Sequence, residues 1–172
     1  GVIFNNWSLG EFKQVGTSVW GQDYGFASDE NTLVETNIDT SNKIIYLKEC
    51  FYLKALTTSQ IAELNSRHAK GGLIIGDSAE PRLLHELKAK GCNVRASIKG
   101  QGSITYGISL LQDYDIVVSP DSINLIKELN NYRWLEKKSK TPIDAWNHIL
   151  DAVRYAVGFQ LQNPNRGKYA VS

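Results

Sequence analysis

Apolar and polar residues alternate over residues 31–39 with the two-residue period of β-strands, and residues 42–53 are rich in β-branched and aromatic side chains. Residues 17–25 predict a strand that ends in a glycine turn. Residues 31–39 and 42–53 predict two further strands, and the segment "TSN" at 40–42 suits the turn between them. Because the connections are short, we expect these three strands to form an antiparallel meander.

The pattern changes after about residue 56, where short apolar strands alternate with helices. Strands are predicted at 73–77, 92–97 and 115–120. Helices are predicted from Thr57 or Thr58 to about His68, from a cap at Ser78 to Gly91, over 102–114, and over 123–132 after a cap at Asp121 or Ser122. Uninterrupted apolar strands are typical of parallel strands covered on both sides. The chain is therefore expected to be an α/β protein, with a mixed sheet in which the antiparallel three-strand meander is followed by parallel βα units, and with helices on both faces.

The last helix carries two different faces. A short hairpin is expected at 132–140, and Thr141 with Asp144 resembles a capping box that would start the helix at Thr141. At about 100° per residue, one stripe of this helix is apolar and is expected to pack on the core: Trp146, Leu150, Val153 and Val157. The opposite side gathers His148, Asp151 and Tyr155. That side either faces solvent or lines a site, and the role of Tyr155 stays open.

Composition narrows the possible classes only a little. The chain has 172 residues, a net charge of +1 and 42% hydrophobic residues, which suits one globular domain. Residues 1–14 read as a linker or the tail of a preceding domain, which leaves 15–172 as the domain itself. No apolar run approaches the roughly 20 residues of a membrane helix, so no membrane partner is expected. The absence of a G-x-x-x-x-G-K-[ST] motif excludes a P-loop ATPase in this chain alone.

Charge is distributed unevenly along the chain. Residues 81–100 carry five basic side chains against one acidic, and residues 133–140 carry four against one. Such stretches can contact phosphates, although charge alone favours the simpler interpretation of solvated surface.

Three carboxylates occupy positions that a purely structural role would not favour. Asp23 interrupts an apolar strand, Asp77 ends the apolar strand "LIIG", and Asp151 lies off the apolar stripe of the last helix. Each also has a structural alternative, namely a turn, a helix cap or an ion pair with Arg154. Their order along the chain, however, is that of a two-metal nuclease with a ribonuclease H-like fold. Carboxylates suit Mg²⁺ or Mn²⁺, and two such ions about 4 Å apart can activate a water and hold the leaving oxygen of a phosphodiester.

An ordered series of segments extends this pattern to most of the chain. They are "GVIFNNW", "WGQDYGFASDENTLV", "LIIGDSAEPRLLHELKAKGCNV", "IKGQGSITYGISLLQDYDIVVSPDSINLIKELNNYRW" and "DAWNHILDAVRYAV". In this series the chain resembles the C-terminal nuclease domain of the large terminase subunit of tailed bacteriophages, a DNA-packaging protein. The resemblance implies a ribonuclease H-like fold and a divalent-metal-dependent endonuclease that cuts concatemeric viral double-stranded DNA with low sequence specificity.

Position by position, the resemblance implies metal ligation by Asp23, Asp77 and Asp151 to two Mg²⁺ or Mn²⁺ ions. It places His148 beside these ligands, and it places Lys99 near the scissile phosphate or the DNA backbone. Many relatives carry an aspartate just before the histidine, where this chain has Asn147. Asp144 is nearby, but the capping box favours a structural role for it.

The resemblance also implies partners and a location. These are double-stranded DNA, the portal protein, the small terminase subunit and an N-terminal ATPase domain, in the cytoplasm of the infected host and transiently at the procapsid portal. Two other hypotheses remain open from the residues alone. One is a junction resolvase or transposase of the same fold, and the other is a non-catalytic domain that docks on portal or capsid.

Overall fold

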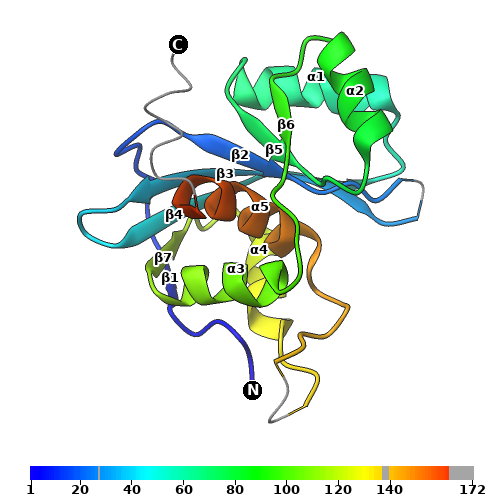
Figure 1. Cartoon of the computed structure of the whole chain (residues 1–172). Coiled ribbons are helices and arrows are strands. Elements are labelled where there is room, and N and C mark those ends of the chain that lie inside the picture. Colours follow the sequence, from blue (N-terminus) through cyan, green and yellow to red (C-terminus); the bar gives the residue numbers. More distant parts are fainter. Residues whose placement is uncertain (27, 137–139, 163–172) are drawn as a thin grey trace.

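The computed structural model describes residues 1–26, 28–136 and 140–162, and within them one mixed sheet crosses the molecule (Figure 1). Its seven strands lie in the order β1-β7-β4-β3-β2-β5-β6. Strand β3 pairs antiparallel with β2 and β4, whereas every other neighbouring pair is parallel. The bounds are β1 (Trp7–Leu9), β2 (Val19–Gln22), β3 (Glu30–Asp39), β4 (Ile44–Lys54), β5 (Ile74–Gly76), β6 (Val94–Ala96) and β7 (Asp115–Val118). The predicted meander and parallel βα units are confirmed.

Helices cover both faces of this sheet, as predicted (Figure 1). One face carries α1 (Thr58–Ala69) and α2 (Pro81–Ala89), and the other carries α3 (Ser103–Gln112), α4 (Ile123–Asn131) and α5 (His148–Gln162). The pleat of β3 separates the two cores, because Leu33 packs in the cluster beneath α1 and α2 and Val34 packs in the cluster beneath α5. No helix in the described ranges is long and apolar enough to cross a membrane.

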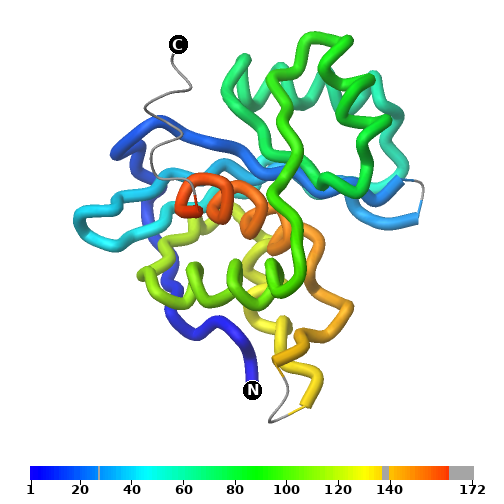
Figure 2. The backbone as a smooth tube through the Cα atoms, viewed as in Figure 1, coloured from blue at the N-terminus to red at the C-terminus, as the bar shows by residue number. Residues whose placement is uncertain are grey.

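The N-terminal segment packs as part of this domain. Ile3 and Phe4 are buried in the core, and the Ile3 amide donates to the Tyr132 carbonyl. Strand β1 then adds to the edge of the sheet beside β7, and the course of this N-terminal segment can be followed in blue in Figure 2. Residues 1–14 thus contribute both a strand and core side chains, and the position at which a preceding domain would end stays a prediction.

The start of the last helix differs from the prediction. Helix α5 begins at His148, not at Thr141, and Pro142 instead forms a bridge with Trp134. Trp146 precedes the helix with φ +57° and is 40% exposed, so its assignment to the apolar stripe was wrong. The other stripe residues, Leu150, Val153 and Val157, are buried as expected.

The hairpin expected at 132–140 can be compared only in part. Arg133 and Trp134 form isolated bridges, to Val2 and Pro142 respectively. Residues 137–139, which include two lysines of the second basic stretch, lie outside the described residues.

A glycine allows α5 to lie directly on the sheet. A Cβ at Gly21 of β2 would be 1.9 Å from the carbonyl oxygen of Ala152 and 3.2 Å from the Cβ of Ala156. Any larger residue would therefore push the helix away from the strand. This close approach matters for function, because Asp151 precedes Ala152 and Asp23 lies two residues after Gly21, on the same side of the pleat.

Candidate metal centre

Asp23 and Asp77 lie side by side at the carboxyl ends of two neighbouring parallel strands. Strands β2 and β5 pair with Gln22 opposite Gly76, and each aspartate is the next residue of its strand. Ile75 packs against α5, so alternation along the strand directs Asp77 to the same side. Both carboxylates therefore come from the strands at the sheet edge where ligands of open α/β sheets bind.

Asp151 completes this group from α5. Its charge and that of Asp77 both act on Asp23, which shows that the three carboxylates converge although they are distant in sequence. All three are partly buried. The structure thus places the three residues that the sequence predicts as metal ligands near one another, although their oxygens do not all lie within 4.8 Å as the ligand atoms of Asp29, Glu30 and His148 do; their binding of metal stays a prediction.

Burial and mutual repulsion change how these carboxyl groups ionise. Burial, with the charges of Asp151 and Asp77, raises the pKa of Asp23 to about 8. Burial also raises the pKa of Asp151 to about 6, although the guanidinium of Arg154 acts in the opposite direction. A divalent cation would remove the repulsion that keeps Asp23 protonated, so this donor set fits a hard metal ion.

Two basic side chains accompany the carboxylates. Lys99 Nζ lies 3.0 Å from Asp77 Oδ1, and its side chain is about half exposed at 49%. Arg154 Nη2 lies 3.5 Å from Asp151 Oδ1, and the guanidinium also lies over the ring of Tyr155. Lys99 is thus next to the carboxylates, with enough exposure to reach a ligand that approaches from solvent.

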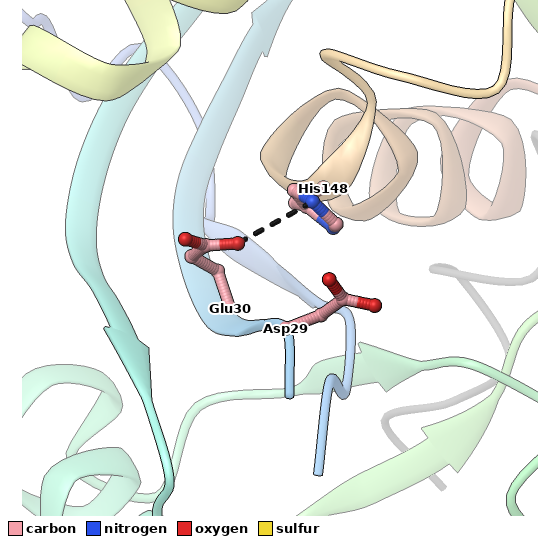
Figure 3. Close-up of side chains that lie close together, drawn as sticks. All are labelled: Asp29, Glu30 and His148. Carbon is pink, nitrogen blue, oxygen red and sulfur yellow. Dashed lines mark ion pairs between the residues drawn. The ribbon is translucent and has the colours of Figure 1, made fainter. Parts of the chain in front are cut away.

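His148 faces a second acidic group that the sequence analysis missed. Its Nε2 lies 3.4 Å from Glu30 Oε2, and the ligand atoms of Asp29, Glu30 and His148 all lie within 4.8 Å of one another (Figure 3). His148 also acts electrostatically on Asp151, one turn along α5. The two groups therefore adjoin through the first turn of this helix. The adjacent acids just after the glycine turn were a signal in the sequence, but only the β2–β3 connection shows that they face His148.

Asp77 also makes a local hydrogen bond, and the structure gives different outcomes for Ser78, Asp144 and Tyr155. Asp77 Oδ1 accepts from the Ala79 amide, whereas Ser78 does not cap α2, whose N-cap is Glu80. Asp144 is exposed and accepts from Asn147 Nδ2 at 3.2 Å, and because α5 begins at His148, Thr141 and Asp144 do not start the helix as the predicted capping box would. Tyr155 is buried in a small cluster with Ile75 and Phe159. Its burial, together with the nearby charge of Asp23, raises the pKa of its hydroxyl.

Comparison with known proteins shows the family and the fold of this chain. The family model described as "Terminase RNAseH like domain" matches residues 23–158. The large terminase subunit of phage PBSX of Bacillus subtilis (strain 168) is 28% identical over 143 residues, which is 80% of this chain and 33% of that protein. The chain thus spans about a third of the length of this relative.

Solved structures show the same fold. The nuclease domain of the large terminase of bacteriophage SPP1, with bound Mn, superposes with a TM-score of 0.82 and 26% identity, covering 93% of this chain and 99% of that one. The large terminase nuclease of the thermophilic phage G20c, with bound magnesium, superposes with a TM-score of 0.63 and 19% identity, covering 91% and 96%. The chain belongs to the family of ribonuclease H-like domains of phage terminases.

Proposed function

We propose that this chain is a divalent-metal-dependent endonuclease that cuts double-stranded DNA during viral genome packaging. The observation that carries the proposal is the convergence of Asp23, Asp77 and Asp151 at one edge of a ribonuclease H-like sheet. The Mn-bound nuclease domain of SPP1 supports it, because that protein shares fold and 26% identity with this chain. Family membership favours packaging over junction resolution or transposition.

The carboxylates would act as the metal ligands. Two Mg²⁺ or Mn²⁺ ions at this centre would supply an activated water and neutralise the leaving oxygen of a phosphodiester. Asp23, Asp77 and Asp151 would hold the ions, and their three negative charges offset much of the positive charge that a two-ion centre concentrates. Asp29 and Glu30 would add oxygen ligands on the side of His148.

His148 and Lys99 would act on the substrate side. The imidazole of His148 lies at the start of α5, between Glu30 and Asp151, where it can ligate metal, orient water or move a proton. The Lys99 ammonium would exchange its contact with Asp77 for a phosphate oxygen of the DNA.

DNA binding would depend on phosphates rather than bases. No part of the described chain resembles a base-reading helix or zinc module, so we propose low sequence specificity and strong salt dependence. We propose that an ATPase domain, the portal protein and the small terminase subunit present the DNA, in the host cytoplasm at the procapsid.

A plasmid assay tests the proposed activity. The purified chain should nick and then linearise supercoiled DNA with Mn²⁺ or Mg²⁺, and EDTA should stop the reaction because the carboxylates alone cannot activate water. A linear duplex and a four-way junction of equal length should be cut at similar rates. Full activity in EDTA would exclude the metal mechanism, and a strong junction preference would favour the resolvase hypothesis.

Replacing Lys99 by alanine should separate DNA binding from metal binding. We expect DNA affinity to fall uniformly across sequences and the slope of log affinity against log salt to decrease by about 1, because one phosphate contact is lost. Mn²⁺ affinity should be unchanged or higher, since the ammonium no longer pairs with Asp77. Lys43→Ala is the matched control, because Lys43 is a similarly exposed lysine paired with Asp113. Equal salt slopes for the two variants would remove Lys99 from the DNA interface.

A further inference from the structure

A buried glutamate from another helix holds the first turn of α5. Glu128 lies on the inward side of α4 between Leu125 and Leu129, and it is only 1% exposed. A carboxylate is costly at such a position unless hydrogen bonds satisfy it. Here three consecutive backbone amides of α5 donate to it, those of His148 to Oε2 at 3.2 Å and of Ile149 and Leu150 to Oε1 at 3.0 Å each.

This contact supplies acceptors for the first amides of α5 from another helix. The first amides of a helix have no partner within the helix, and they concentrate the positive end of its dipole. The carboxylate of Glu128, which comes from α4, accepts hydrogen bonds from these amides and places a negative charge at the positive end of the dipole. A leucine at 128 would fill the same space in the core but would leave three buried amides without acceptors.

Tyr52 links the same glutamate to His148. Its hydroxyl donates to Glu128 Oε2 at 2.7 Å, and its ring meets the His148 ring edge-on with centroids 6.3 Å apart. The backbone and the ring of His148 are thereby fixed from two directions. Asp151 follows one turn later, and its amide bonds to the Asn147 carbonyl within the same turn.

We propose that Glu128 is a positioning residue of the metal centre, which sets where α5 begins and so aims His148 and Asp151 at the carboxylates of the sheet. The inference rests on the proposed metal centre and deepens it. It states that the Glu128 carboxylate, which would touch neither substrate nor metal, orients His148 and Asp151. Groups that orient metal ligands typically change metal affinity by about 10- to 100-fold when they are replaced.

Glu128→Gln tests this role selectively. The glutamine carbonyl can still accept from Ile149 and Leu150, whereas its amide group would face the His148 amide and cannot accept from it. Tyr52→Phe is a second variant that removes one donor to Glu128 and leaves the backbone bonds in place. Thr57→Ala is the matched control, since it removes the side-chain cap of α1 on the opposite face of the sheet.

Mn²⁺ binding is measured by titration calorimetry on each variant at a temperature where circular dichroism shows it folded. We expect Glu128→Gln to weaken Mn²⁺ affinity about tenfold and to raise the Mn²⁺ concentration for half-maximal plasmid cleavage by the same factor. Tyr52→Phe should weaken affinity by a smaller factor, about threefold, and Thr57→Ala should leave it unchanged. In a His148→Ala background, Glu128→Gln should weaken affinity by a smaller factor than in the wild type, because part of its effect acts through His148 and the rest through Asp151.

Wild-type affinity in Glu128→Gln, or an equal loss in Thr57→Ala, would overturn the positioning role. Full additivity with His148→Ala would also overturn it. If Glu128→Gln does not fold, Tyr52→Phe decides the question, and unchanged affinity in that variant counts against the proposal. A wild-type chain that binds Mn²⁺ but cuts no DNA would contradict the proposed nuclease function and leave the positioning role of Glu128 intact. A wild-type chain that binds no Mn²⁺ would contradict both proposals.

Discussion

Asp151→Asn is expected to abolish DNA cleavage, lowering the rate by about 1,000-fold, or about 4 kcal/mol of transition-state stabilisation. Asparagine keeps the shape of the side chain but removes the negative charge, and its amide group would present hydrogens to a cation. The residue precedes Ala152, whose carbonyl oxygen lies against Gly21 of β2, so close packing on the sheet holds the helix backbone that carries Asp151. Plasmid cleavage with saturating Mn²⁺ measures the effect.

The fold and DNA binding should survive this change. Arg154 would lose an ion-pair partner. Burial already disfavours the charge of Asp151, however, so removing that charge from the metal-free protein offsets the loss of the ion pair. Asp144→Asn is the matched control, because Asp144 is an exposed aspartate just before α5 that bonds to Asn147. Cleavage by Asp151→Asn within threefold of wild type would show that Asp151 is not a metal ligand.

The metal-free protein should lose stability as pH rises, and Asp23→Asn should suppress much of this loss. The pKa of Asp23 is raised from an ordinary value of 3.8 to about 8, so between these values the folded state keeps a proton that the unfolded state releases. The contribution of Asp23 to the free energy of unfolding is therefore complete below about pH 4 and is lost as the pH rises to about 8. The unfolding free energy of Asp23→Asn relative to wild type should increase by about 1 kcal/mol per pH unit between pH 5 and 7.

Bound Mn²⁺ should counteract the loss of wild-type stability at higher pH. A metal ligand is ionised, so metal binding releases the Asp23 proton and becomes tighter as pH rises towards 8. Urea unfolding with and without Mn²⁺ should therefore show metal stabilisation of the wild type that grows with pH, and none for Asp23→Asn. If the unfolding free energies of wild type and Asp23→Asn change in parallel with pH in the absence of metal, the pKa of Asp23 is not raised by burial and neighbouring carboxylates. Asp144→Asn should follow the wild-type profile.

Much of the fold could be predicted from local patterns. Alternation predicts β3, β-branched and aromatic residues predict β4, and short apolar runs predict β5 and β7, because a strand buried on one face alternates whereas a strand buried on both faces is apolar throughout. The carboxylates at 23, 77 and 151 were selected for the related reason that a charge in or beside an apolar element needs a partner. The structure brings all three together.

Other features depend on contacts between distant segments. A capping box is a local signal, and the sequence shows one at Thr141, but α5 begins at His148 because Glu128 of α4 accepts from its first amides. Asp29 and Glu30 face His148 only after the β2–β3 connection folds against α5. Residues 1–14 carry no clear period, yet they pack into the core and extend the sheet.

Residue order alone predicts the layered α/β architecture and three candidate metal-ligating carboxylates, because both predictions depend on which residues avoid water. The start of the last helix, the acidic residues around His148 and the close approach of α5 to β2 follow only from the folded arrangement. These depend on the backbone amides left unpaired at a helix start and on the space beside a glycine, and neither can be assigned until the partner segment is in place.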